Sequence, residues 1–332
     1  MTRAASMLIK PGDNVLELGA TLQDTSMAIA LAAGPDGTVV QLDVKRKVPK
    51  GSKATRTNFG RNSTKLSPPS SSVSSLASCT FHELSKISDY ISTINLHIHL
   101  PISVFVCDIQ AMTGADLPSQ LETITLLRTL LLTCPKTSSP TIIIKSSSLN
   151  TLSLRLIHSQ RLTSPLPHLP RSSLPFIIST VGVKSYRSTI PYTLKPSDCV
   201  LEIGCHAGTT TNLLNKATQG GAIGVDIGMK ILKSARVNYP TVKFERGDAW
   251  KTAELARIRW KVMEEVESLE GRVYDVIYLD VGGLSGGDGL LDSLALLDSL
   301  SFALEPRVII IKSLSVQRLA SSLKPFARIW QK

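Results

Sequence analysis

Glycines and an acidic residue gather at one point in the second half of the sequence. The apolar run at residues 199–203 contains Glu202 and ends at Gly204, and Gly208 follows after a short interval. Glycine lets a backbone turn tightly and approach a ligand without a Cβ atom in the way. The threonines at 209–211 favour the start of a helix, whose first N–H groups are free to bind a ligand. The segment predicts a strand, a ligand-binding turn and a helix.

The turn differs from that of a dinucleotide-binding site, because His206 stands where a further glycine would be expected. A nicotinamide site needs three glycines in the pattern GxGxxG to seat a pyrophosphate. Glu202, two residues before Gly204, is instead placed to meet a cationic ligand. A nicotinamide-dependent oxidoreductase is therefore disfavoured.

Further acids follow the next apolar runs. Asp226 ends the run at 222–226, where an acid can accept hydrogen bonds from ribose hydroxyls. Asp248 and Ala249 follow the run at 242–246, where an acid can receive the amino group of adenine and a small residue can lie against the ring. Asp280 ends a fourth run, and Lys312 ends a fifth. These residues are the candidate ligand-binding and catalytic groups.

The elements that must position these residues are alternating strands and helices. Short apolar runs alternate with helical stretches, which is typical of βαβ units in a parallel sheet. In the second half we expect strands at 199–203, 222–226, 242–246, 275–280 and 307–312, and helices near 209–218, 229–238, 251–269, 288–304 and 314–323. A sixth strand is expected at 327–330.

The chain also repeats itself. Residues 10–19 match residues 195–204, and residues 141–146 match residues 308–313, in the same order. The pattern predicts two tandem Rossmann-like α/β domains, each a doubly wound sheet in three α/β/α layers. In the first copy Glu17, Asp43 and Asp108 are present, but Gly19 is not followed by a second glycine. We expect this copy to be degenerate and structural.

The domain boundaries follow from composition. We expect a first domain at 1–151, a linker at 152–180 and a second domain at 181–332. Residues 50–80 are rich in Ser, Lys and Pro and are predicted to be a disordered insertion in the first domain.

Residues 199–312 resemble class I methyltransferases that depend on S-adenosylmethionine (SAM), in a series of motifs: glycine turn, ribose acid, adenine acid and strand-four acid. The resemblance implies a SAM-binding second domain. It implies that the cofactor-binding residues are Glu202, Gly204, Gly208, Asp226, Asp248 and Ala249, with Asp280 near the methyl group. His206 departs from the family pattern, and it would either crowd the methionine moiety or serve the substrate.

A weaker resemblance concerns the catalytic residues. RNA ribose 2′-O-methyltransferases of the FtsJ type are similar in having a lysine before the glycine turn, an acid after strand four and a lysine after strand five. The resemblance implies Lys184, Asp280 and Lys312 as catalytic residues, with a lysine acting as base for a poorly nucleophilic hydroxyl. A fourth member, a later glutamate, is absent from the sequence. A strand-end lysine that extends its amino group to solvent explains Lys312 equally.

The composition limits the classes of partner that the protein is expected to bind. The formal net charge is +11, which favours RNA or another anionic substrate, although solvation of polar loops explains part of it. Five cysteines without a CxxC pair indicate neither a zinc site nor a disulfide framework, so we expect no metal and an intracellular, most simply cytoplasmic, location. No apolar run reaches membrane-spanning length. The sequence sets neither the compartment within the cell nor the oligomeric state.

The main alternative is a non-catalytic protein. A degenerate first copy and a loop insertion also suit a methyltransferase-like scaffold, or an RNA-binding assembly factor. Binding of SAM together with methyl transfer would discriminate the two functions.

Overall fold

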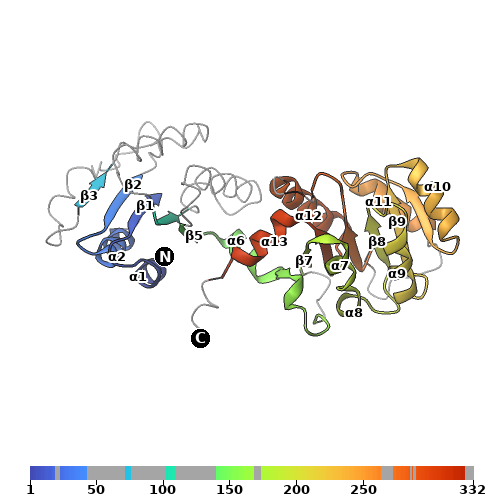
Figure 1. Cartoon of the computed structure of the whole chain (residues 1–332), viewed down its shortest axis with the longest axis horizontal. Helices are drawn as coiled ribbons and strands as arrows, with labels where there is room; N and C mark the ends of the chain where they lie inside the picture. The colour runs from blue at the N-terminus through green and yellow to red at the C-terminus, as the bar shows by residue number, and fades with distance from the viewer. Residues whose placement is uncertain are drawn as a thin grey trace, which may run out of the picture. The chain divides into compact units, whose positions relative to one another are not determined.

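The computed structural model divides the chain into two compact units, Met1–Asn150 and Thr151–Lys332 (Figure 1). The structure describes residues 1–18, 23–42, 72–75, 102–108, 140–167, 173–262, 272–284, 286 and 289–325. Gly19, Asp43, most of the predicted insertion and the predicted strand at 327–330 lie outside these ranges. Each unit is described by itself.

The first unit contains a five-stranded parallel sheet in the order β3-β2-β1-β4-β5. Its strands are β1 (Asn14–Leu18), β2 (Thr38–Leu42), β3 (Ser72–Ser75), β4 (Val104–Asp108) and β5 (Thr141–Lys145). Helices α1 (Thr2–Leu8) and α2 (Gln23–Ala33) belong to this unit, and α6 (Ser147–Arg155) crosses into the second. β1 and β4 are buried along their whole length, as expected for strands covered on both faces. The prediction that residues 50–80 are a disordered insertion is wrong at β3, because these four residues form a strand that pairs with β2.

The second unit contains a seven-stranded sheet in the order β10-β9-β8-β11-β12-β7-β6, in which every neighbouring pair is parallel. Its strands are β6 (Leu156–His158), β7 (Phe176–Thr180), β8 (Val200–Ile203), β9 (Ala222–Asp226), β10 (Lys243–Arg246), β11 (Val276–Leu279) and β12 (Val308–Lys312). The five strands predicted in the second copy are confirmed within one residue at each end.

The predicted linker at 152–180 is wrong, because this segment supplies β6 and β7 to the second sheet. β7 pairs with β12 in register from Phe176 opposite Val308 to Thr180 opposite Lys312. The apolar run that forms β7 is short and lies in a stretch rich in Ser and Pro, so its composition resembles a linker. Pairing with β12 buries Ile177 and Ile178 almost completely and covers what would otherwise be a sheet edge.

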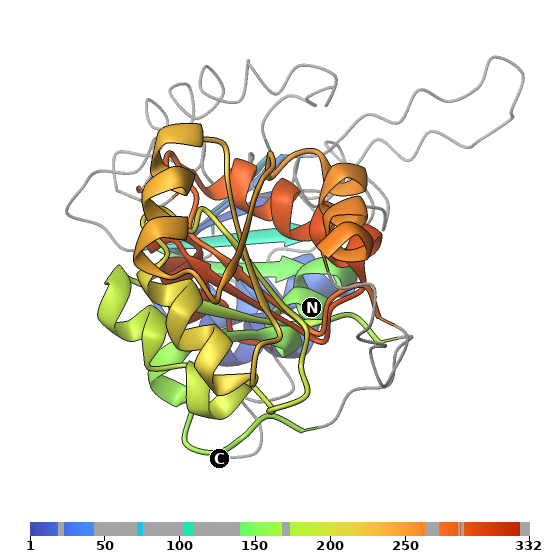
Figure 2. The same ribbon diagram turned by 90° about the vertical axis from the view of Figure 1, so that its right-hand side faces the viewer.

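Helices cover both faces of this sheet. They are α7 (Gly182–Arg187), α8 (Ile190–Thr193), α9 (Thr209–Ala217), α10 (Met229–Asn238), α11 (Thr252–Val262), α12 (Leu290–Leu304) and α13 (Leu314–Ser322), with a short 3-10 turn η4 (Ser159–Arg161). Figure 2 shows α9 and α10 on one face and α11 and α12 on the other. This arrangement follows from right-handed crossovers, since the chain moves outward from β8 to β10 and then crosses to β11. The α/β, doubly wound fold is therefore as predicted.

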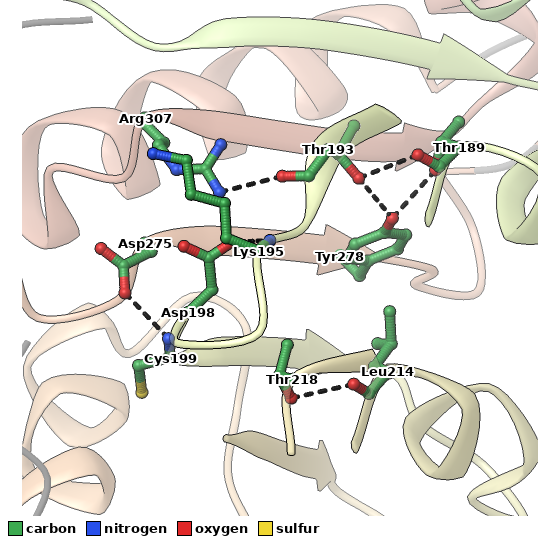
Figure 3. Close-up of polar contacts among 10 residues, drawn as sticks. All are labelled: Thr189, Thr193, Lys195, Asp198, Cys199, Leu214, Thr218, Asp275, Tyr278 and Arg307. Carbon is green, nitrogen blue, oxygen red and sulfur yellow. Dashed lines mark hydrogen bonds and ion pairs between the residues drawn. The ribbon is translucent and has the colours of Figure 1, made fainter. Parts of the chain in front are cut away.

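A buried polar network links β11 to the segments that precede β8 and β12 (Figure 3). The Tyr278 hydroxyl on β11 lies 3.0 Å from the Thr189 hydroxyl and 2.8 Å from that of Thr193. Arg307, just before β12, forms a buried ion pair with Asp198 and donates to the Thr193 carbonyl oxygen at 2.9 Å. The network attaches α8 and the turn before β8 to the sheet.

None of the helices in the described part of the chain is long and apolar enough to cross a membrane. The same residues contain no group of three or more His, Cys, Asp or Glu side chains arranged to hold a metal ion.

Candidate functional site

A cavity of about 690 Å³ opens at the carboxyl ends of the central strands of the second unit. The strand order reverses between β8 and β11, and ligands of open α/β sheets bind at such a switch point. The volume is in the range of small-molecule sites. Eight of the ten predicted site residues line it: Glu202, Gly204, His206, Asp226, Asp248, Ala249, Asp280 and Lys312.

The two glycines of the turn have different roles. Gly204 has a φ of +81°, and a Cβ atom there would lie 2.0 Å from the carbonyl oxygen of Asp280. It therefore allows the end of β8 to pass directly beside the end of β11 under the cavity. Gly208, with a φ of +80°, begins α9 and does not line the cavity. A Cβ atom there would lie 2.5 Å from the Phe244 ring, so glycine at this position lets the start of α9 pack against β10.

His206 lies between these glycines in the left-handed backbone region, with a φ of +47°. Its side chain is exposed and lines the cavity, and its N–H donates to Asp226 Oδ2 at 3.1 Å. The hydrogen bond joins the glycine turn to the end of β9. His206 therefore holds the turn in place through its backbone and presents an imidazole to the cavity.

Two acids are held at the ends of β9 and β10. Asp226 Oδ1 also accepts from the N–H of Gly228 at 2.9 Å, so both carboxylate oxygens are oriented by backbone groups. Asp248 Oδ1 accepts from the N–H of Trp250 at 3.0 Å. Each carboxylate oxygen keeps a second lone pair that can accept a hydrogen bond from a ligand. The half-exposed Trp250 ring and the exposed Ile227 side chain line the cavity beside them.

Glu202 is buried on β8 and accepts a hydrogen bond from the Thr211 hydroxyl at 2.5 Å. Burial, with a smaller contribution from the nearby Asp280, raises the pKa of its carboxyl to about 8, although Thr211, Arg187 and Lys312 oppose the shift. The carboxyl group is therefore largely protonated near neutral pH. The prediction that Glu202 meets a cationic ligand as an anion thus requires that binding first displace a proton.

Asp280 and Lys312 form an ion pair at the ends of adjacent strands β11 and β12. Both side chains are about one-fifth exposed, and both line the cavity. Lys184 does not join them: it is exposed on α7 and outside the cavity lining. Of the three residues predicted to be catalytic, Asp280 and Lys312 line the cavity and Lys184 does not, because α7 places Val183 and Arg187 in the lining.

Sequence reasoning missed Arg187 as a cavity residue. Residues 182–187 form α7, which packs against the sheet at β12. Tyr186 is buried and meets the Tyr278 ring edge to face at 5.1 Å. The spacing of Val183 and Arg187, four residues apart on a helix, was the available signal, since such residues share one face.

The first unit has matching polar pairs at the equivalent strand ends. The Ser26 hydroxyl donates to the buried carboxylate of Glu17, as Thr211 donates to Glu202, with the same separation of nine residues along the chain. Lys145 forms an ion pair with Asp108 at 2.9 Å, as Lys312 does with Asp280.

Comparison with known proteins adds little. No family model matches the sequence, and no curated protein matches it. A TehB-like SAM-dependent methyltransferase from Corynebacterium glutamicum is 16% identical with a TM-score of 0.27, covering 42% of this chain and 71% of that one. Phosphoethanolamine N-methyltransferase 2 from Haemonchus contortus, solved with S-adenosyl-L-methionine, is 11% identical with a TM-score of 0.25, covering 99% of this chain and 81% of that one. Similarity this low supports no functional conclusion about this chain.

Proposed function

We propose that the second unit binds SAM and acts as a SAM-dependent methyltransferase. The observation that carries the proposal is the cavity at the switch point, which brings three acids from the ends of three adjacent strands, Glu202, Asp226 and Asp248, around one space. SAM has an ammonium and a sulfonium group, ribose hydroxyls and an adenine amino group, and each of these is a partner for a carboxyl group.

The residues present fit this cofactor. Asp226 is the acceptor for ribose hydroxyls, and Asp248 is the acceptor for the adenine amino group, with Ala249 and Trp250 against the ring. Gly204 lets the ligand approach the backbone, and Glu202 lies at the far end for the ammonium. Bound SAM would supply a methyl group on a sulfonium that is intrinsically reactive, so the contribution of the protein is chiefly to position the acceptor.

The methyl acceptor is proposed to be RNA or another anionic molecule, and this rests on the net charge of +11. Asp280 and Lys312 line the cavity and are placed to hold an acceptor hydroxyl. Lys312 is paired with Asp280 in the ligand-free protein, so the two side chains together are placed to orient the acceptor.

A non-catalytic scaffold is the second candidate function. The observation that favours it is the matching ion pair of Asp108 and Lys145 in the first unit, which we propose is a degenerate copy from a tandem duplication. A structural role of the pair in both units would explain why it is present in a unit without a complete glycine turn. Turnover therefore has to be tested separately from binding.

The test is calorimetric titration of SAM and S-adenosylhomocysteine into the full-length protein and an Asp226→Ala variant. We expect one site in the wild-type protein and at least a tenfold weaker site in the variant, about 1.4 kcal/mol. Asp292→Ala is the matched control, because Asp292 is exposed on α12 and outside the cavity lining. Thermal unfolding verifies that each variant is folded. Absence of binding to the folded wild-type protein would exclude the proposed function.

If SAM binds, transfer of a labelled methyl group to a pool of RNA separates the enzyme from the scaffold. Labelled RNA that is lost with Asp280→Asn supports the catalytic proposal. Binding of SAM without labelled RNA, protein or small-molecule product supports a SAM-binding scaffold.

A further inference from the structure

Arg187 is held rigidly at the edge of the cavity. It lies in the last turn of α7, is half-buried and lines the cavity. Its Nε–H donates to the Thr210 hydroxyl at 3.0 Å, in the first turn of α9. One side of the planar guanidinium is thereby fixed, and the Nη groups form no hydrogen bond within the described residues. A fixed, planar fork of N–H donors matches the two oxygens of a carboxylate.

The positive charge of Arg187 is not balanced by a carboxylate among the described residues. Lys312 also lines the cavity, but its charge is balanced by Asp280. Within the part of the chain that the structure describes, Arg187 has no carboxylate at ion-pair distance, and its partner is the neutral hydroxyl of Thr210. Glu202 interacts electrostatically with Arg187, but it accepts its hydrogen bond from Thr211 instead. A partly buried cation without an anionic partner is unfavourable, so the cavity is suited to a ligand that brings one.

The neighbouring acids define which anion fits. Glu202 and Asp280 both line the cavity and interact electrostatically with each other. A phosphate dianion beside Arg187 would bring no cationic group for these two carboxyl groups. A zwitterionic amino acid suits the arrangement, because its ammonium can face the acids while its carboxylate faces the guanidinium.

We propose that Arg187 is the residue that binds the α-carboxylate of the ligand, so that the cavity selects ligands with an intact amino-acid group. The proposal rests on the proposed function, because it assigns one end of the SAM molecule. A contact with nucleic acid would instead place a phosphate beside the guanidinium.

The experiment combines substitutions of Arg187 with removal of the carboxylate from the ligand. Binding of S-adenosylhomocysteine and of its decarboxylated analogue is measured by calorimetry with the full-length wild-type protein, Arg187→Gln and Arg187→Lys. We expect the wild-type protein to bind S-adenosylhomocysteine at least tenfold more tightly than the decarboxylated analogue. Arg187→Gln should abolish this preference, and Arg187→Lys should keep part of it, because a lysine keeps the charge but not the planar fork.

Lys216→Gln is the control, since Lys216 is exposed near the end of α9 and outside the cavity lining. It should keep the full preference. If Arg187→Gln weakens both ligands equally, or if orthophosphate displaces S-adenosylhomocysteine competitively in the wild-type protein alone, the assignment of the carboxylate is wrong. Failure of the folded wild-type protein to bind S-adenosylhomocysteine would overturn the proposed function as well, so the two failures are distinct. Should Arg187→Gln unfold, the comparison of the two ligands with Arg187→Lys decides.

Discussion

His206 has an unfavourable backbone conformation, and its side chain forms no hydrogen bond within the described residues that would offset the cost. A side chain in the left-handed region costs roughly 1 kcal/mol relative to glycine, and this imidazole is exposed. Strain of this kind is found most often at ligand sites. The position of His206 at the cavity is consistent with a role in binding and not in folding.

Replacing His206 with glycine should therefore stabilise the protein. We expect His206→Gly to raise the free energy of unfolding by ~0.5–1 kcal/mol relative to His206→Ala, because alanine keeps the strain and removes only the imidazole. Urea denaturation of both variants measures the difference. A glycine variant that is less stable than the alanine variant would show that the left-handed conformation is not strained here.

Glu202 predicts a pH-dependent stability with a definite sign. The pKa of its carboxyl is about 8 in the folded chain and near 4.5 when exposed, so the folded state holds a proton that the unfolded state loses in this interval. Stability of the ligand-free protein should fall through this contribution as pH rises from about 4.5 to about 8.

The variant Glu202→Gln lacks this dependence and keeps a hydrogen-bond acceptor for Thr211. Its stability advantage over the wild-type protein should grow by ~1.4 kcal/mol per pH unit between pH 6 and pH 8, and level off above that. Urea denaturation at several pH values measures it. A constant difference between the two proteins would mean that Glu202 ionises normally in the folded state.

At the scale of elements, the start of α9 depends on contact with β10. Gly208 and Gly220 both have a positive φ. A Cβ atom at Gly208 would meet the Phe244 ring, whereas a Cβ atom at Gly220 would have no other atom within 4 Å. Gly220→Ala should cost ~1 kcal/mol from backbone strain alone. Gly208→Ala should cost a further ~1–3 kcal/mol, because Phe244 must move. Equal losses in denaturation experiments would show that the ring moves freely.

The equivalent polar pairs in the two units also belong to this scale. In each unit a buried strand-end glutamate accepts from a hydroxyl in the following helix, and the fourth and fifth strands carry an Asp–Lys pair. If the strands are counted from β1 in the first unit and from β8 in the second, five strands of each sheet follow the order 3-2-1-4-5. Because both pairs are determined by strand position, a duplication would preserve them even where ligand binding was lost.

At the scale of the whole molecule, ligand binding should affect one unit. Hydrogen exchange of the full-length protein with saturating S-adenosylhomocysteine is expected to protect amides at 199–228 and 246–250, and to leave those at 14–18 and 38–42 unchanged. The reason is that the cavity is lined by the second unit alone. Protection of β1 and β2 would instead indicate a second ligand site in the first unit.

The sequence by itself determined the repeated α/β pattern and eight of the residues that line the cavity. Both are local properties: an apolar run predicts a buried strand, and an acid at its end must lie at the sheet's carboxyl edge. Residues whose role depends on distant neighbours required the tertiary structure. Only the fold shows that β7 pairs with β12, and only the packing of α7 shows that Arg187, and not Lys184, faces the cavity. Similarly, Glu202 has a raised pKa because residues from other elements remove it from water, which its own sequence context does not reveal.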